Sequence, residues 1–572
     1  MQSIKPKKRN FVSPQIEFKW ENIQPYLDNL KNRPINNLSD LQKWMKDRSE
    51  LNEVLSEELG WRYIRMSIDT THEKFQKDFQ YFIQNINPHL APYDDLLNRK
   101  LNDSRFKSEL EKNPDFKIPL KRIQTNIELF REENIPLQTK LEEESQKYGA
   151  IAAKMTVEID GKEHTLQQAS NLLKNTDRSV REKVYTLIQN RRLEDRENLH
   201  QLFDQLLDLR QQVADNAGFD NYRDYMFKAM ERYDYTPEDC FKFHEAIAEK
   251  VVPLTENIDK IRKEKLGVHN LRPWDVAVDF EGKKPLHPFK DGEELLRKTI
   301  ACFDLIDPFF GDCLKQMKEK KHLDLESKKG KAPGGFNYPL YESGYPFIFM
   351  NAVGAMRDVT TMIHEGGHAI HSVLTHPLEL VEFKSMPSEI AELASMSMEL
   401  ISMDNWHVFF DEKEDLKRAK RDQLLDVLTV LPWVATIDKF QHWIYTHKNH
   451  SHEEREAEWL KLMHTFGSEL LDWNGLENFK AINWQKQLHL YEVPFYYIEY
   501  SMAQLGAVAI WKNYKENPSK TIQQYKDALS LGYTRSIHEV YETAGIKFDF
   551  SKEYVAELME FVYSEFQNYL ID

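Results

Sequence analysis

Apolar side chains recur at helical spacing over much of the N-terminal half of the chain. From Leu38 to about residue 240 they return every three or four positions, which is typical of amphipathic helices that bury one face. One such stripe comprises Leu41, Trp44, Met45, Leu51, Val54 and Leu55. A short alternation around Asp160-Gly161 predicts a β-hairpin, and a helix begins after it at Asp177. The N-terminal half of the chain is therefore predicted to be largely helical, with one hairpin.

Two further helices are predicted between residues 358 and 400. The first carries apolar residues on several sides and ends before Pro377. The second begins at Pro387, a residue suited to a first helical turn. Ahead of both, residues 332–338 and 345–351 have the pattern of a turn and a strand. The fold class is therefore mainly α, with a small β-hairpin or sheet.

Composition narrows the class of protein. The 572 residues are 41% hydrophobic and 30% charged, which suits a soluble globular protein, and no stretch is apolar enough to cross a membrane. The basic start lacks the apolar run of a signal peptide, so we expect a cytoplasmic location and no membrane partner. A net charge of −16 argues against nucleic-acid binding. The three cysteines show no metal-ligand spacing among themselves and are interpreted as reduced thiols.

The first predicted helix contains the pattern H-E-x-x-H as His364, Glu365 and His368. Positions four apart lie on one face of a helix, so both imidazoles can bind a single Zn²⁺ while Glu365 lies beside an open coordination position. The string alone is short enough to occur by chance in a long chain. Its place in an apolar helix favours a metal site.

Two adjacent glycines, Gly366 and Gly367, lie inside this helix. Each destabilises a helix interior by about 1 kcal/mol relative to alanine. We interpret them as positions where a metal site or a substrate approaches the backbone closely. The alternative is a tight crossing of two helices.

A catalytic zinc needs a third protein ligand and keeps its fourth position for water. The pattern H-E-x-x-H-x-x-G-x-x-H does not continue, because residue 371 is His371 and residue 374 is Leu374. On the second predicted helix, Glu392 and Glu399 are seven residues apart and share an otherwise apolar face, where a carboxylate is rarely left unpaired. Both are candidates for the site.

These motifs, with the hairpin and the helix that begins at Asp177, together resemble the oligoendopeptidase F branch of the thimet oligopeptidase family of zinc metallopeptidases, from about residue 155 to the C-terminus. By this resemblance we expect an N-terminal helical domain over residues 1–190 and a zinc metallopeptidase catalytic domain over residues 191–572. The resemblance implies Glu392 as the third ligand of one Zn²⁺ per chain, and Glu399 as a residue that hydrogen-bonds and orients a ligand histidine. It also implies a helical, clamshell-like zincin with a deep channel that admits short unstructured peptides.

A second segment combines a histidine with several phenols near the C-terminus. Related peptidases place a histidine and one or two tyrosines from this region over the zinc, and by position Tyr500, then Tyr497 and His489, match best, with Tyr496 beside them. The segment lacks the glycine-rich run of the thimet branch, which favours the oligoendopeptidase F branch. We expect Tyr500 and His489 to stabilise an oxyanion, and Tyr497 and Tyr496 to contact substrate.

The predicted activity is hydrolysis of internal bonds in oligopeptides, with a zinc-bound water as the nucleophile. Zn²⁺ polarises the carbonyl and acidifies the water, and Glu365 acts as the general base that later passes the proton to the leaving amine. The predicted strand over residues 345–351 can bind an extended peptide, with Gly335 permitting close approach; a hairpin that only caps the core is the alternative.

Two other functions remain open. A zinc carboxypeptidase or dipeptidyl carboxypeptidase would share the motif but needs a cation for the substrate's carboxylate, for which Arg357 is a candidate. A non-catalytic helical scaffold with a structural zinc would have four protein ligands rich in cysteine, and no cysteine lies near residues 364–392. The sequence leaves open whether the protein is a monomer or a homo-oligomer.

Overall fold

The computed structural model describes residues 4–570, which divide into two compact units. Unit 1 comprises residues 4–129, 287–419 and 503–548, and unit 2 comprises residues 130–286, 420–502 and 549–570. Helices make up most of each unit and the strands are few and short. The predicted mainly α class with a small sheet is confirmed. The clamshell around a channel stays a prediction.

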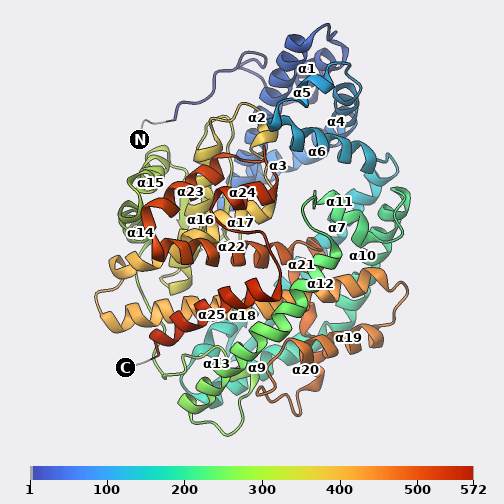
Figure 1. The fold of residues 1–572 in the computed structure, drawn as a ribbon. Helices are drawn as coiled ribbons and strands as arrows, with labels where there is room; N and C mark the ends of the chain where they lie inside the picture. Colours follow the sequence, from blue (N-terminus) through green and yellow to red (C-terminus); the bar gives the residue numbers. More distant parts are fainter. Residues whose placement is uncertain (1–3, 571–572) are drawn as a thin grey trace. The chain divides into compact units, whose positions relative to one another are not determined.

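Unit 1 contains the helices expected to hold the metal. Its helices are α1 (Trp20–Asn32), α2 (Leu38–Ile68), α3 (Glu73–Asn85), α4 (Asn87–Asn102), α5 (Lys107–Leu110), α6 (Lys117–Leu129), α14 (Gly292–Ile306), α15 (Pro308–Lys320), α16 (Met356–Thr375), α17 (Ser388–Ser402), α23 (Pro518–Ser530) and α24 (Ile537–Thr543). The apolar stripe predicted on α2 is buried throughout and forms a core with α1, α4 and α6. This layer of helices is visible in Figure 1.

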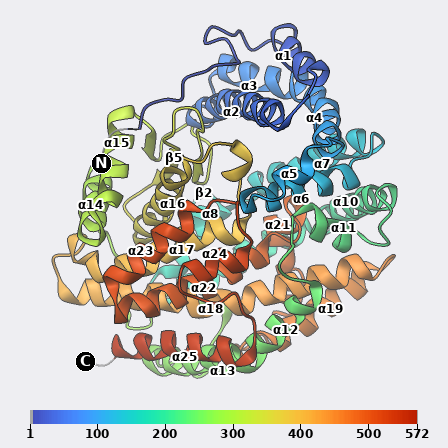
Figure 2. The same ribbon diagram turned by 45° about the horizontal axis from the view of Figure 1, so that its top comes forward.

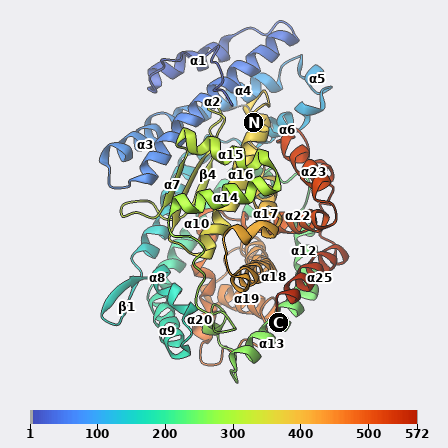
Figure 3. The same cartoon turned by 90° about the vertical axis from the view of Figure 1, so that its left-hand side faces the viewer.

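Helix α16 is the centre of a second layer in unit 1. It packs against α17, α14, α15 and α23, and Figure 3 shows α14 and α15 on one side of it. Its apolar residues Met362, Ile363 and Ile370 are fully buried. The Asp358 carboxylate accepts hydrogen bonds from the backbone N–H of Val353 (2.8 Å) and Ala355 (2.9 Å), which fixes the entry into the helix. The predicted helix over residues 358–374 is thus confirmed as α16.

A three-stranded sheet lies against α16, with β5 beside the helix in Figure 2. Its strands are β3 (Leu323–Glu326), β4 (Phe336–Tyr338) and β5 (Phe347–Ala352), in the order β3-β5-β4. Strand β5 is central, parallel to β3 and antiparallel to β4, and its side chains are buried except at Asn351. Because β5 is paired on both sides, the prediction that the strand over residues 345–351 offers a free edge to a peptide is wrong. Strand β4 therefore lies at an edge of the sheet, close to α16.

Unit 2 is also helical. Its helices are α7 (Asn134–Ala153), α8 (Leu166–Asn171), α9 (Arg178–Glu194), α10 (Arg196–Asn216), α11 (Tyr222–Ala229), α12 (Pro237–Ala246), α13 (Val252–Leu266), α19 (His452–Thr465), α20 (Glu477–Ala481), α21 (Leu488–Glu492) and α25 (Lys552–Asn568). Helices α18 (Lys413–Thr446) and α22 (Tyr497–Glu516) have residues in both units. The predicted hairpin is present as β1 (Thr156–Ile159) and β2 (Lys162–Thr165), with Asp160 and Gly161 at positive φ in the turn.

The domain boundary predicted near residue 190 lies within α9 and stays a prediction. The compact units follow a different division, since each combines three separate stretches of chain. Over residues 4–570, the helices are too short or too polar for any of them to traverse a lipid bilayer.

Candidate active site

The two histidines of the H-E-x-x-H pattern lie one turn apart on α16. The ring centroids of His364 and His368 are 4.8 Å apart, and the side chains are 21% and 19% exposed. Glu365, between them in sequence, is only 7% exposed. The helix therefore presents two imidazoles at an accessible face and keeps a buried carboxylate beside them.

The two glycines of α16 are explained by helix crossings. A Cβ added at Gly367 would lie 2.7 Å from the Cα of Ser395 on α17, and one added at Gly366 would lie 2.8 Å from the Phe303 ring of α14. Any larger residue would push these helices away from α16. The interpretation that a metal or a substrate requires these glycines is therefore wrong, and the alternative of a tight crossing is correct.

The crossing of α16 and α17 brings Glu392 to the histidines. Its Oε2 lies 3.3 Å from Nε2 of His364 and 3.7 Å from Nε2 of His368. One ligand atom from each of the three residues lies within 4.8 Å of the others. Ser395 donates a hydrogen bond to the same Oε2 of Glu392 (3.0 Å), which holds the carboxylate in this orientation. This set of two imidazoles and a carboxylate fits Zn²⁺.

Glu399 contacts this group of three ligands through His364. Its Oε1 is 2.7 Å from Nδ1 of His364, so Nδ1–H donates and Nε2 faces Glu392. Burial acts to lower the pKa of His364, but the carboxylates of Glu392 and Glu399 outweigh it and raise the pKa well above its usual value. The cluster thus attracts a positive charge, which a divalent cation would provide.

The protonation states of the other ligands also suit a metal. Burial alone would raise the pKa of Glu392, but the His364 and His368 imidazoles lower it to about 2, and burial lowers the pKa of His368 to about 4. Glu392 is therefore ionised and His368 neutral near pH 7, as metal ligands must be.

Glu365 has the environment expected of a proton acceptor. Burial raises its pKa to about 7, partly offset by His364. Asn337 of β4 donates a hydrogen bond to the Glu365 backbone carbonyl (3.1 Å), which ties the edge strand to this turn of α16. A carboxyl whose pKa lies near neutrality both accepts and releases a proton readily.

The histidine and phenols near the C-terminus form a group within unit 2. Figure 1 shows α21, which carries His489, and α22, which begins at Tyr497. The His489 ring centroid lies 4.7 Å from that of Tyr497, 6.0 Å from that of Tyr500 and 6.3 Å from that of Tyr496. All four side chains are half-buried. The sequence-predicted residues of this segment are thus gathered around one imidazole.

Gln487 sets the tautomer of His489. Trp433 Nε1 donates to Oε1 of Gln487 (3.1 Å), which leaves the amide nitrogen of Gln487 to donate to Nδ1 of His489 (2.7 Å). Burial lowers the pKa of His489, so the ring is neutral with its proton on Nε2. His489 is therefore prepared to donate one hydrogen bond from Nε2.

The turn that leads into the tyrosines is held by Arg232 and Gln441. Phe495 has a positive φ of 69°, which is unfavourable for a side chain of this size. Gln441 accepts a hydrogen bond from the Phe495 N–H (2.6 Å), and Arg232 donates to the Phe495 carbonyl and to Glu499 (3.0 Å). The side chains of Arg232 and Glu499 are buried, so this ion pair fixes the start of α22.

Known proteins resemble this chain in sequence and in fold. The model of peptidase family M3 matches residues 171–560, and that of the peptidase M3 N-terminal domain matches residues 13–130. The chain belongs to peptidase family M3. It is 23% identical over 317 residues to oligopeptidase PepF of Bacillus subtilis and 23% identical over 185 residues to an oligoendopeptidase F homolog of Lactococcus lactis.

The aligned segments cover part of these two family M3 proteins: 46% of the Bacillus protein and 54% of this chain, and 30% of the Lactococcus protein and 32% of this chain. Two solved structures match almost completely. Pz peptidase A with an inhibitor has a TM-score of 0.88 and 25% identity over 97% of this chain and 99% of its own. A structure assigned to oligoendopeptidase F has a TM-score of 0.87 and 25% identity over 95% of each chain. The predicted resemblance to the oligoendopeptidase F branch is confirmed.

Sequence reasoning on this M3 chain missed several residues that support the site. Asn337, Ser395 and Gln487 each hydrogen-bond a predicted site residue or its backbone. Ser395 had a signal, because a serine three residues after Glu392 on a helix lies on the same face. Asn337 and Gln487 had none, since their contacts depend on tertiary packing.

Gly335 lies beside β5, and a Cβ there would approach the Phe349 carbonyl at 3.2 Å.

Proposed function

We propose that the chain is a zinc-dependent oligoendopeptidase that hydrolyses internal bonds of short unstructured peptides. The proposal rests chiefly on the convergence of His364, His368 and Glu392 within 4.8 Å, beside the buried carboxyl of Glu365. Two histidines and one glutamate are a ligand set of catalytic zinc sites that keep a fourth position open. They would hold one Zn²⁺ per chain.

Zn²⁺, when bound, supplies Lewis-acid activation of the scissile carbonyl and of water. The Glu365 carboxylate accepts the proton of the attacking water and later delivers it to the leaving amine, and its pKa of about 7 suits both steps. Glu399 accepts a hydrogen bond from Nδ1 of His364 (2.7 Å) and so keeps this histidine in the tautomer whose Nε2 is free to bind the metal. Glu365 and Glu399 therefore have separate tasks.

The phenols and the imidazole of unit 2 are proposed to act on the substrate. Tyr500 and His489 donate hydrogen bonds to the developing oxyanion, and the neutral ring of His489 has its Nε2–H available for this. Tyr497 and Tyr496, whose rings adjoin that of His489, contact the peptide. Hydroxyl and Nε2–H donors suit an oxygen that gains negative charge.

Strand β4 is proposed to bind the peptide backbone. It lies at an edge of the sheet, and its residue Asn337 is hydrogen-bonded to the carbonyl of Glu365, so a peptide paired with this strand would lie near the metal ligands. Gly335, exposed at the start of β4, adds no side chain that would obstruct such pairing. Main-chain hydrogen bonds give affinity with little sequence preference.

The test combines metal content with hydrolysis of an internally quenched peptide blocked at both ends, for the wild type and Glu365→Gln. We expect both proteins to hold zinc at the His364 site and only the wild type to cleave. A variant that cleaves at the wild-type rate would remove Glu365 from the role of base.

The same peptide distinguishes a carboxypeptidase. Arg357 is exposed on α16 seven residues before His364, and therefore on the same helix face, where it could bind a free carboxylate. An endopeptidase cleaves amidated and free-ended peptides alike, whereas a carboxypeptidase needs the free C-terminus. Zinc binding with cleavage of free-ended peptides alone would therefore replace the proposed specificity with the carboxypeptidase alternative.

A further inference from the structure

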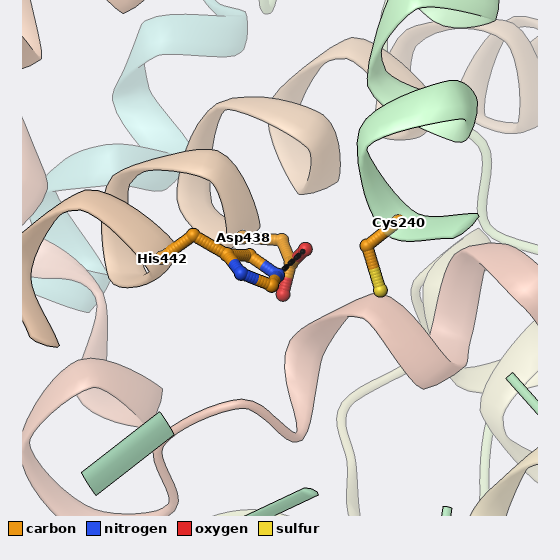
Figure 4. A group of neighbouring side chains, drawn as sticks. All are labelled: Cys240, Asp438 and His442. Atoms are coloured by element: carbon orange, nitrogen blue, oxygen red, sulfur yellow. Dashed lines mark ion pairs between the residues drawn. The ribbon is translucent and has the colours of Figure 1, made fainter. Parts of the chain in front are cut away.

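A second group of metal-ligand side chains lies inside unit 2, on helices α12 and α18. Cys240 and His244 are four residues apart on α12, and Asp438 and His442 are four residues apart on α18. Residues at this spacing share one helix face, so each helix contributes a pair of donors. Figure 4 shows Cys240 on α12 beside Asp438 and His442 on α18.

The donor atoms of Cys240, Asp438 and His442 converge, and His244 adjoins them through Asp438. One ligand atom each from Cys240, Asp438 and His442 lies within 4.8 Å of the others. Oδ2 of Asp438 lies 2.9 Å from Nε2 of His244 and 3.2 Å from Nε2 of His442. Ligand atoms around a tetrahedral Zn²⁺ lie about 3.3–3.5 Å apart, given bonds of about 2.0–2.3 Å. Small side-chain shifts would therefore give Cys240, Asp438 and His442 a bond each to one ion, and Nε2 of His244 would turn from Asp438 to the ion as the fourth ligand.

In the part of the chain that the structure describes, hydrogen bonds leave several polar atoms of the two histidines and of Asp438 unsatisfied, although Nε2 of His244 is hydrogen-bonded to Oδ2 of Asp438 (2.9 Å). His442 Nε2 is within 3.2 Å of Asp438, yet among residues 4–570 neither nitrogen of His442 has a partner with hydrogen-bond geometry. The same holds for Nδ1 of His244 and Oδ1 of Asp438 in the described chain. The four residues are 0–2% exposed. Buried polar atoms of this kind are normally satisfied, and a shared metal ion would bring the donors together without hydrogen-bond angles.

The surroundings of this group are largely aromatic, with Phe241, Phe243 and Phe466 in ring contact with His244. The ammonium of Lys439, next to Asp438, lies 5.8 Å from the Phe466 ring centroid.

We propose that Cys240, His244, Asp438 and His442 form a closed site for one divalent transition-metal ion such as Zn²⁺. A thiolate and a carboxylate supply two negative charges, which a divalent ion neutralises in the buried interior. Mixed sulfur and imidazole ligands favour Zn²⁺ or Co²⁺ over Ca²⁺ or Mg²⁺. Four protein donors close the coordination sphere, so the ion is structural and joins α12 to α18.

Cobalt substitution tests this site without measuring hydrolysis. Cys240 supplies a thiolate to this site, whereas the His364 site contains no sulfur ligand. The full-length wild type, stripped of metal and reloaded with Co²⁺, is expected to bind two ions per chain and to show a thiolate-to-cobalt charge-transfer band. Cys240→Ser should lose the band and one ion.

Three comparisons make the result decisive. Cys302→Ser, which changes a buried cysteine of unit 1, should keep the band and both ions. The double variant Cys302→Ser/Cys313→Ser leaves Cys240 as the single cysteine and should also keep the band, which tests the site even if Cys240→Ser does not fold. His364→Ala/His368→Ala should lose one ion and keep the band. A wild type that binds one ion without a charge-transfer band would overturn the proposal and leave the His364 site unaffected.

Discussion

The two groups of metal-ligand residues differ in the one feature that separates catalysis from structure. Both use side chains four residues apart on a helix, His364 and His368 in unit 1 and Asp438 and His442 in unit 2. In unit 1 the side chains of His364 and His368 are 21% and 19% exposed, whereas in unit 2 the side chain of His442 is 3% exposed and that of Asp438 is fully buried. Catalytic zinc keeps an open position, and structural zinc does not. The two groups also differ in that one includes a cysteine, but it is access that decides which of them can bind substrate.

The strongest way to break this comparison is to remove one ligand from each group. His368→Ala is expected to lower kcat/KM by about 10³-fold or more, because Lewis-acid catalysis supplies several kcal/mol. Cys240→Ser is expected to leave kcat/KM little changed while one ion is lost. Steady-state kinetics and metal analysis on the same preparations measure both effects. Equal losses of activity in the two variants would show that the groups do not divide into catalytic and structural sites.

A second prediction concerns the hydrogen-bond donors to the oxyanion, which the proposed catalytic site needs and the proposed structural site does not. Tyr500→Phe is expected to lower kcat by about 10²- to 10³-fold, because the variant loses one hydrogen bond to the oxyanion. Metal content should not change. Single-turnover hydrolysis of the quenched peptide measures the step directly. Tyr497→Phe is the matched control, and full turnover by Tyr500→Phe would move this role to Tyr497 or Tyr496.

The two groups also differ in how far the sequence predicted them. His364, Glu365 and His368 belong to one helix, so a local pattern was sufficient to predict them as a group. On α17 the pattern left both Glu392 and Glu399 as candidates, and the family resemblance assigned their roles. His244 and Asp438 are 194 residues apart, and their contact depends on how α12 packs against α18. The cysteines were compared with one another and not with His244, so the spacing of Cys240 and His244 was missed.

The fold, like the site, was predictable where it depends on local sequence and not where it depends on contacts between distant segments. The apolar stripe of α2 and the hairpin at Asp160-Gly161 follow from periodicity and turn chemistry, and both are present. The glycines of α16 were given the wrong reason, because Ser395 and Phe303 reach them from other helices. Arg232, which holds the turn at Phe495, was not identified because its partners lie more than 260 residues away. Long-range packing is the information that a single sequence lacks.

A third prediction concerns the residues that hydrogen-bond the ligand histidines, in which the two groups also differ. Glu399 hydrogen-bonds Nδ1 of His364, whereas within residues 4–570 Nδ1 of His244 and of His442 lack such a partner. Glu399→Gln is expected to weaken metal affinity at the His364 site by about 10- to 100-fold. Competition with a chelator measures the change, and the thiolate-to-cobalt band is an internal control that should stay constant. Unchanged affinity at the His364 site would remove Glu399 from its orienting role.

The smallest expected effect comes from His371, a histidine of α16 outside both groups. Burial lowers its pKa to about 3, with His368 contributing, and its Nε2 has no hydrogen-bond partner among the described residues. The unfolded chain, with a histidine pKa of about 6.5, binds a proton that the folded chain excludes, so stability falls as the pH drops below 6.5. At pH 5.5 this difference is about 1.4 kcal/mol. Urea unfolding of the metal-free protein at pH 7.5 and pH 5.5 measures this change in the free energy of unfolding. Between the two pH values the wild type should lose about 1.4 kcal/mol more stability than His371→Leu. Parallel pH dependence in the two proteins would mean that His371 is protonated in the folded state, and that burial without a facing carboxylate does not keep a histidine of α16 neutral.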